Sequence, residues 1–255
     1  MARAALRGRL TWRLGAVVEL RQETPHVRTI VLDVPEWPGH RPGQHVDVRL
    51  TAEDGYQTER SYSIASPPEQ ELLELTVERL DDGEVSPYLV GELREGDRLE
   101  LRGPIGGYFV WSAAASAVDE SPLLLVAGGS GVVPLMCMLR HRAAAARRPA
   151  ARLLYSARTA DELIYRDELD RLVAARDGLA VTVTLTGAPP PGWTGPTRRI
   201  DERMLAGTAW PAAQRPAAFV CGPTGLVEAV AGDLVKLGHD PGRIKIERFG
   251  PTGGA

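Results

Sequence analysis

The sequence predicts an α+β protein of two domains, a six-stranded antiparallel β-barrel followed by a doubly wound parallel α/β domain. Up to Pro104 short β-rich runs alternate with turn signals, and from Pro122 apolar strands alternate with helices. The segment between them is rich in Ala and Ser and has no periodicity. With 255 residues the chain is long enough for two compact domains. We therefore predict a barrel domain over 1–110, a linker over 111–121 and an α/β domain over 122–255.

The barrel is predicted from short strands bounded by Pro-Gly, Asp-Gly and Glu-Gly-Asp turns. These strands are expected at 12–19, 27–34, 44–50, 59–65, 72–79 and 98–102. One helix is expected at 86–93, with Ser86 as its N-cap and Pro87 at the first helical position. Six short strands with a single helix favour a small antiparallel barrel.

The second domain is predicted from alternating strands and helices. Strands are expected at 123–127, 152–156, 179–185, 217–221 and 243–247, and helices at 132–146, 161–175 and 223–237. Thr159 and Glu162 have the spacing of a capping box for the middle helix. Strands without polar alternation are typical of a parallel sheet covered on both faces.

Composition excludes several classes of protein. A formal net charge of −3 gives no general polycation for nucleic acid or for an anionic membrane. The two cysteines, Cys137 and Cys221, are too few for an iron–sulfur cluster or a disulfide framework, and the histidines show no metal-ligand spacing. The apolar run 122–139 is interrupted by glycines and Pro134, and no signal peptide precedes it. We expect a cytoplasmic monomer without a metal site.

The strand at 59–65 carries the first candidate binding residues. Side chains in a strand alternate, so Arg60 and Tyr62 share one face, and Ser61 and Ser63 share the other. An arginine suits a phosphate, and a tyrosine can stack on a flat ring, which together suit a phosphorylated aromatic cofactor. A half-exposed strand with an incidental arginine explains the pattern as well.

Three further segments have the chemistry of anion sites. The N-terminus of the helix at 86–93 offers free backbone N–H groups, although a plain capped helix has the same pattern. The glycine-rich loop 128–134 follows a strand and opens a helix, which suits a pyrophosphate, but it lacks the full Gly-x-Gly-x-x-Gly fingerprint. The loop 221–225 repeats the strand-to-helix arrangement, so both loops are expected to face one crevice. Cys221 is explained equally well as a small buried residue.

Taken in order, these motifs resemble the ferredoxin–NADP reductase family, in particular the single-flavin reductase modules of bacterial oxygenase systems. They are Arg60-Ser61-Tyr62-Ser63, Gly83-x-x-Ser86, Gly128-Gly129-Ser130-Gly131-x-x-Pro134 and Cys221-Gly222-Pro223. The resemblance covers nearly the whole chain. It implies hydride transfer from NAD(P)H to FAD, with electrons passed on to an acceptor.

The resemblance also assigns roles to individual residues. By it, Arg60 holds the flavin pyrophosphate, Tyr62 stacks on the isoalloxazine, Ser63 bonds near the flavin N5, and Ser61 completes the motif. The backbone N–H groups that contact the pyrophosphate belong to Gly83, Val85 and Ser86. The dinucleotide is held by Gly128, Gly129, Ser130, Gly131 and Val132, and Cys221, Gly222 and Pro223 lie by the nicotinamide. Phe249 covers the other flavin face, although the chain continues past it, and Thr224 stands where the family commonly has proline.

Because the family's iron–sulfur domain is not found here, we expect a separate acceptor, a ferredoxin-like or other one-electron carrier. A reductase of free flavin, quinone or dioxygen is the alternative, as is a flavoprotein subunit active only inside a larger complex. A basic docking face is expected at Arg140, Arg142, Arg147 and Arg148, although a solvated helix end has the same composition. Arg158 is expected to contact a 2′-phosphate and favour NADPH, although an exposed loop arginine is equally ordinary.

Overall fold

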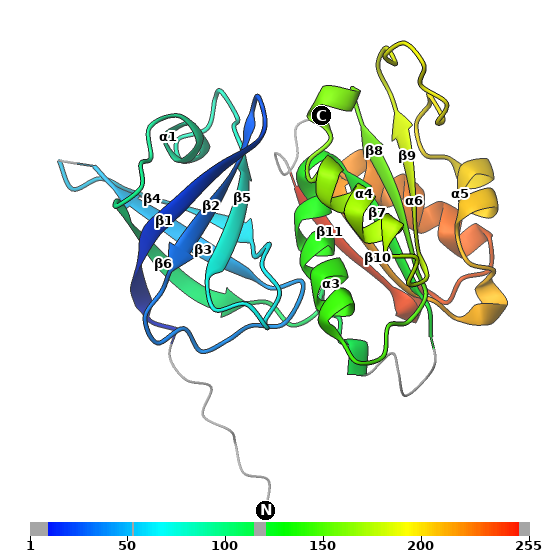
Figure 1. Ribbon diagram of the computed structural model, residues 1–255, viewed down its shortest axis with the longest axis horizontal. Coiled ribbons are helices and arrows are strands. Elements are labelled where there is room, and N and C mark those ends of the chain that lie inside the picture. Colours follow the sequence, from blue (N-terminus) through cyan, green and yellow to red (C-terminus); the bar gives the residue numbers. More distant parts are fainter. Residues whose placement is uncertain (1–9, 53, 115–120, 250–255) are drawn as a thin grey trace, which may run out of the picture.

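The computed structural model describes residues 10–52, 54–114 and 121–249, which form two sheets lying side by side (Figure 1). The first sheet is antiparallel, with the order β4-β3-β6-β1-β2-β5. Its strands are β1 (Trp12–Thr24), β2 (Val27–Asp33), β3 (His45–Thr51), β4 (Gln57–Ser63), β5 (Leu73–Glu78) and β6 (Arg98–Ile105). An isolated bridge between Ile64 and Leu75 brings the two edge strands together and closes the barrel. The predicted barrel is confirmed.

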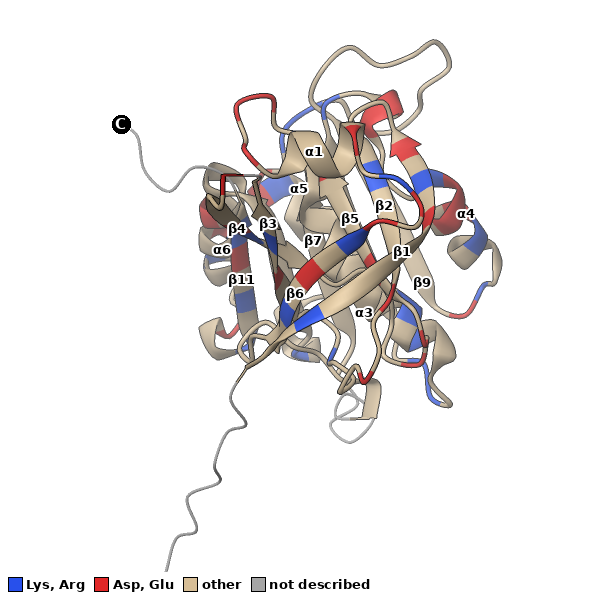
Figure 2. Ribbon diagram, turned by 90° about the vertical axis from the view of Figure 1, so that its left-hand side faces the viewer, with Lys and Arg blue, Asp and Glu red and all other residues tan. Residues whose placement is uncertain are grey.

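Alternation along the strands separates the two faces of the barrel. Val46 and Val48 of β3 face an apolar interior. On the outside, Arg49 of β3 pairs with Glu100 of β6. Arg102 of β6 makes a similar outer pair with Asp47. Figure 2 marks acidic and basic positions along the ribbon of these strands in red and blue. The outer face is thus held by ion pairs, and the inner face by apolar packing.

The second sheet is parallel, with the order β11-β10-β7-β8-β9. Its strands are β7 (Leu123–Gly128), β8 (Ala151–Ala157), β9 (Leu179–Leu185), β10 (Ala217–Pro223) and β11 (Ile244–Phe249). The longer helices are α3 (Val132–Ala144), α4 (Arg166–Ala174), α5 (Glu202–Thr208) and α6 (Thr224–Lys236), while α1 (Ser86–Gly91) belongs to the barrel. Short 3₁₀ turns are η1 (Gly129–Gly131), η2 (Ala160–Glu162), η3 (Ala212–Gln214) and η4 (Pro241–Arg243).

Helices cover both faces of this sheet, as the doubly wound prediction requires. Leu123 and Leu125 of β7 pack into the cluster formed with α3 and α4. Leu124 and Val126, which alternate with them along β7, pack into the cluster formed with α5 and α6. Each residue of β7 is therefore buried, which explains its continuous apolar sequence.

Every predicted strand is present, and the differences lie mainly in helix ends. The predicted helix at 161–175 is instead η2, an extended link and α4, because α4 begins only after Tyr165, whose backbone is left-handed (φ 61°). The predicted capping box is wrong, since the side chain of Thr159 makes no capping hydrogen bond. Helix α5 was not predicted, although Asp201 caps it by accepting a hydrogen bond from the N–H of Met204 at 2.7 Å.

Strand β1 extends well beyond its predicted end at 19 because it serves two partners. It pairs with β6 over its first residues and with β2 from Ala16 to Thr24. The predicted linker at 111–121 falls mostly on residues 115–120, which lie outside the described part of the chain. Among the described residues, no helix combines the length and the apolar character that crossing a membrane requires.

Candidate functional site

The outer end of β4 presents a set of donors that converge on one carboxylate. The guanidinium of Arg60 lies 3.4 Å from Glu84, the hydroxyl of Thr58 donates to the same oxygen at 3.1 Å, and Tyr56 donates to the other oxygen at 3.2 Å. On the opposite face of the strand Ser61 donates to Asp47 at 2.6 Å. The predicted alternation therefore holds, and it places the hydroxyl of Ser61 away from Arg60.

The next two residues of β4, Tyr62 and Ser63, are more buried than Arg60 and Ser61. The half-buried ring of Tyr62 packs against the barrel core, and this burial raises the pKa of its phenol to about 12 despite the nearby charge of Arg60. The phenol therefore keeps its proton well above neutral pH. Ser63 is buried and pairs with His45 across the sheet.

The loop before α1 differs from its prediction. Val85, not Ser86, occupies the N-cap position, and the hydroxyl of Ser86 accepts a hydrogen bond from the N–H of Leu80 at 3.0 Å. The N–H of Gly83 donates to the carbonyl of Leu80 at 2.9 Å, so it is engaged in a turn. Within the described residues, the backbone N–H groups of Val85 and Ser86 have no backbone acceptor. Two of the three predicted N–H donors are thus available to an anion.

A cleft of about 830 Å³ lies between the barrel and the second domain. On one side it is lined by Gly128, Gly129, Ser130, Ser156, Arg158 and Pro223. On the other side β5 and the turn between β1 and β2 contribute side chains such as Glu78 and His26. The two predicted glycine-containing loops therefore open on one cleft, and Arg158 lies in it as well.

Gly131, Val132, Cys221 and Gly222 are buried and do not line this cleft. The two loops touch at Gly131, Cys221 and Gly222. A Cβ on Gly131 would come within 2.1 Å of the carbonyl oxygen of Cys221, and one on Gly222, whose φ is +155°, would come within 3.1 Å of Gly128. Only glycine permits this approach. The backbone of one loop therefore fixes the position of the other.

Cys221 contacts a carboxylate that the sequence did not reveal. Its buried thiol donates to Glu247 of the neighbouring strand, with Sγ 3.7 Å from Oε2. Burial raises the pKa of the Cys221 thiol well above its ordinary value, and burial raises the pKa of the Glu247 carboxyl to about 7. Both groups can therefore carry a proton near neutral pH. The parallel register of β10 and β11 sets Cys221 opposite Glu247 and Pro223 opposite Phe249. This register is the feature that would have revealed the contact.

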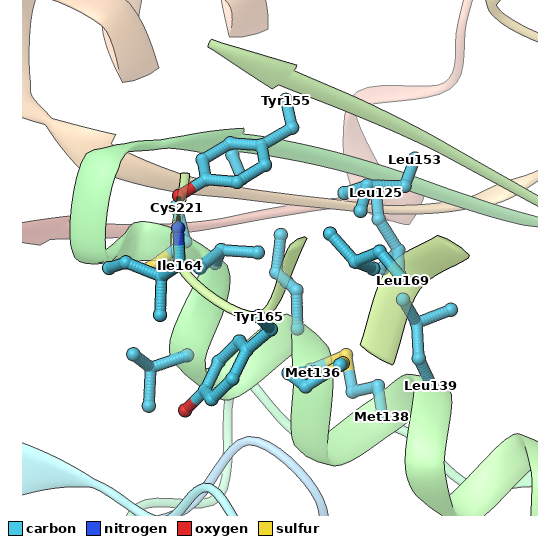
Figure 3. Packing of buried hydrophobic residues seen from close by; sticks show 14 of the residues in the cluster. Leu125, Met136, Met138, Leu139, Leu153, Tyr155, Ile164, Tyr165, Leu169 and Cys221 are labelled. Carbon is cyan, nitrogen blue, oxygen red and sulfur yellow. Dashed lines mark hydrogen bonds between the residues drawn. The ribbon is translucent and has the colours of Figure 1, made fainter. Parts of the chain in front are cut away.

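One buried cluster connects the end of the β4 segment with the two loops. It contains Ala65, two residues after Ser63, together with Val132 and Cys221, and Phe249 packs against it. Figure 3 shows Cys221 in this cluster with side chains from α3 and from the link before α4. Of the predicted catalytic residues, Cys221 lies in this cluster and Phe249 packs against it, while Ser63 lies two residues before its member Ala65.

The predicted basic docking face is not present as expected. The guanidinium of Arg140 is 2.8 Å from Glu74 and 2.6 Å from Glu168, and that of Arg142 is 2.9 Å from Asp177. These side chains are largely buried because their acidic partners, distant in sequence, fold onto the helix. Arg147 and Arg148 remain exposed, and Arg148 also approaches Asp177 at 3.4 Å. Two further exposed arginines line the cleft between the domains and were not predicted: Arg79, which pairs with Asp81 at 2.9 Å, and Arg199.

Comparison with known families agrees with this geometry. The family model of the oxidoreductase FAD-binding domain matches residues 15–110, and that of the oxidoreductase NAD-binding domain matches residues 125–232. Together they cover most of the chain.

Among curated relatives, the glycine betaine monooxygenase reductase subunit of Pseudomonas aeruginosa is 32% identical over 239 residues, which are 92% of this chain and 63% of the relative. The reductase component of the naphthalene 1,2-dioxygenase/salicylate 5-hydroxylase systems of Ralstonia is 27% identical, over 94% of this chain and 69% of the relative. The chain thus spans about two thirds of the length of these relatives.

Solved structures show the same architecture. The flavohem-like FAD/NAD binding domain of nitric oxide dioxygenase from Vibrio cholerae matches with a TM-score of 0.81 and 26% identity, over 94% of this chain and 99% of that chain. A ferredoxin NADP+ reductase from Neisseria gonorrhoeae with bound FAD and NADP matches with a TM-score of 0.76 and 20% identity, over 94% and 98% of the two chains. This chain therefore belongs to the oxidoreductases that join this FAD-binding domain to this NAD-binding domain.

Proposed function

We propose that this reductase takes hydride from NAD(P)H onto FAD at the junction of its two domains and passes electrons to a separate one-electron carrier. The observation that carries the proposal is the buried cluster shared by Ala65, Val132 and Cys221, with Phe249 packed on it. It joins the strand proposed for flavin to the loop proposed for the dinucleotide. When bound, FAD accepts a hydride and releases electrons singly.

The donors around Glu84 fit a flavin pyrophosphate. Arg60, Thr58 and Tyr56 already hold an anionic group, the carboxylate of Glu84, in an exposed position. A phosphate can replace that carboxylate and add the free N–H groups of Val85 and Ser86. Arg60 is proposed to supply the charge, and Tyr62 to place its neutral ring against the flavin.

The nicotinamide coenzyme is proposed to lie in the cleft between the domains. Gly128, Gly129 and Ser130 line one side of it, and helix α3 begins two residues later, at Val132. Cys221 and Glu247 adjoin the second loop, where burial favours their protonated forms and so limits negative charge near the coenzyme. The proposed role of this chain is to orient the two rings and to exclude water, since hydride transfer itself needs no acid or base.

The test is an absorption spectrum of the purified protein before and after anaerobic addition of NADH or NADPH. We expect the spectrum of oxidised flavin, bleached by the coenzyme, and release of FAD rather than FMN on acid treatment. A protein that binds no flavin, or whose flavin is not reduced by either coenzyme, would refute the proposal.

Coenzyme preference is proposed to depend on two of the three arginines that line the cleft, since the third, Arg79, is paired with Asp81. Arg158 and Arg199 line the same cleft, are exposed, and form no ion pair among the described residues. A 2′-phosphate between them would gain charge-assisted contacts, worth about 1.5–3 kcal/mol for one arginine. Replacing Arg158 with Ala should therefore lower the ratio of catalytic efficiency for NADPH over NADH about tenfold, and an unchanged ratio rejects this role.

The acceptor is proposed to be a ferredoxin-like protein, because relatives include a ferredoxin–NAD(P)+ reductase component. Turnover with such a carrier or with ferricyanide is expected to exceed turnover with free flavin. Free flavin or quinone as the better acceptor would favour a diffusible-acceptor reductase, and ferricyanide turnover only within a complex would favour a dependent subunit. The isolated chain is proposed to be a monomer, and its two free cysteines support a cytoplasmic location.

A further inference from the structure

Arg140 is the central residue of the contact between the two domains. It lies on α3, the helix that begins at the dinucleotide loop, and its guanidinium has partners in both domains. It donates to Oε2 of Glu74 on β5 at 2.8 Å and to the carbonyl of Ala65 at 2.9 Å. It also holds Glu168 of α4 with two hydrogen bonds, of 2.8 and 2.6 Å. The ring of Tyr165 lies 5.0 Å from the guanidinium carbon.

The carboxylate of Glu74 is held from several sides at once. Its side chain is only 5% exposed, and its second oxygen accepts from Arg21 at 2.6 Å and from Gln70 at 3.1 Å. Burial alone raises the pKa of Glu74, but Arg140 and Arg21 more than offset this, so its pKa lies below the ordinary value. A charged Glu74 beside Arg140 is therefore the stable state of the interface at neutral pH.

Further hydrogen bonds join these residues to Ala65 and Ser66, which follow the strand proposed to bind flavin. The N–H of Ala65 donates to the carbonyl of Glu74 at 2.8 Å, and the N–H of Glu74 donates to the hydroxyl of Ser66 at 3.0 Å. The thiol of Cys137, one helical turn before Arg140, donates to the carbonyl of Ser66 at 3.0 Å. Helix α3 is thus hydrogen-bonded directly to residues 65 and 66, which lie two and three positions after Ser63.

Arg140 is close enough to both proposed ring positions to control the distance between them. It is eight residues after Val132, or about 12 Å along the helix. Ala65 is two residues after Ser63, or about 7 Å along an extended chain. We propose that Arg140 is a positioning residue that sets the gap between the flavin and the nicotinamide by fixing α3 against residues 65 and 74. The inference rests on the proposed function, since both rings are placed by it.

Arg142 provides a matched control on the same helix. Its side chain is 2% exposed, against 12% for Arg140, and it is also paired with a carboxylate, that of Asp177 at 2.9 Å. Its other hydrogen bonds go to the carbonyls of Pro149 and Asp177. All these partners belong to the second domain, so its loss affects stability without releasing the contact between domains.

The experiment compares Arg140→Met and Arg142→Met with the wild-type holoenzyme. It measures melting temperature, FAD content, coenzyme dissociation constant and the limiting rate of anaerobic flavin reduction with NADH or NADPH, using coenzyme carrying hydrogen or deuterium at the transferred position. Failure of the wild-type flavin to be reduced would refute the proposed function itself, before any variant is compared.

Both variants are expected to melt at a lower temperature, because each removes one arginine from a largely buried carboxylate. Arg140→Met alone is expected to lower the limiting rate by about tenfold or more, with an undiminished isotope effect. Its FAD content and coenzyme dissociation constant should stay within about threefold of wild type. Arg142→Met should keep the limiting rate within about twofold of wild type.

Equal slowing by both variants, or a rate for Arg140→Met within about twofold of wild type, overturns the inference. Should Arg140→Met fail to fold, Arg140→Lys decides, because lysine keeps the charge but cannot bind Glu168 twice and reach Ala65 together. A reduction rate about fivefold lower supports the inference, and an unchanged rate overturns it.

Discussion

Replacing Gly131 with Ala tests whether the contact between the two loops positions the coenzyme. The backbone of Gly131 is not the obstacle, since its φ of −60° suits any residue. The added Cβ would instead lie 2.1 Å from the carbonyl oxygen of Cys221 and 2.7 Å from the nitrogen of Gly222, where ordinary contacts begin at 3.4 Å. Backbone atoms cannot rotate away, so the loops must separate by about 1 Å, at a cost of about 1–3 kcal/mol of stability.

A displacement of this size at a site of hydride transfer should slow the reaction by about 10²-fold. The assay is stopped-flow reduction of the bound flavin at saturating NAD(P)H, alongside thermal unfolding. Gly225→Ala is the control, because Gly225 lines the same cleft and a Cβ there meets nothing within 4 Å. It should leave the rate unchanged and stabilise α6 by about 0.5–1 kcal/mol. A Gly131→Ala protein with the wild-type reduction rate would show that the loop contact does not position the coenzyme.

Three further predictions concern the proposed site. Folding raises the pKa of Glu247 from 4.5 to about 7, so as pH rises the unfolded chain loses this proton before the folded protein does. The free energy of unfolding should therefore fall by up to about 3 kcal/mol between pH 4.5 and about pH 7. Glu247→Gln should remove this decline in denaturant unfolding curves, and an identical pH profile would contradict the raised pKa. Cys221→Ala should slow flavin reduction in stopped flow while coenzyme binding stays within a few-fold; equal rates would leave Cys221 as a buried packing residue. Arg60→Ala should weaken FAD binding by about 1.5–3 kcal/mol, measured by flavin fluorescence after dialysis, and full retention of FAD would reject its phosphate contact.

The sequence was most informative where local pattern alone decides structure. The strand at 59–65 was read correctly because its alternation places Arg60 toward Glu84 and Ser61 toward Asp47. The two loops were also located correctly, because a glycine-rich turn between an apolar strand and a helix is a local signal.

The errors arose where a distant partner overrides a local preference. The capping box at Thr159 and Glu162 fails because Tyr165 is drawn into the domain interface, where its hydroxyl donates to Thr76 of β5. The basic face fails because Arg140 meets Glu74, which is 66 residues away in the sequence. Nothing in a single sequence pairs two charges at that separation.

The bonds that join the domains also limit how this chain can recombine with its relatives. On the α3 side, Arg140 needs Glu74, and on the β11 side, Lys245 donates to the carbonyl of Val110 at 2.9 Å while Tyr108 donates to that of Ile244 at 3.3 Å. In each of these bonds, one partner precedes the segment between the domains in the sequence and the other partner follows it. A chimera that exchanges whole domains at this segment with a relative lacking either charge would keep one member of the Arg140–Glu74 pair without the other, leaving a charge buried in a foreign interface. Functional hybrids should therefore be those in which residues 74 and 140 come from the same parent.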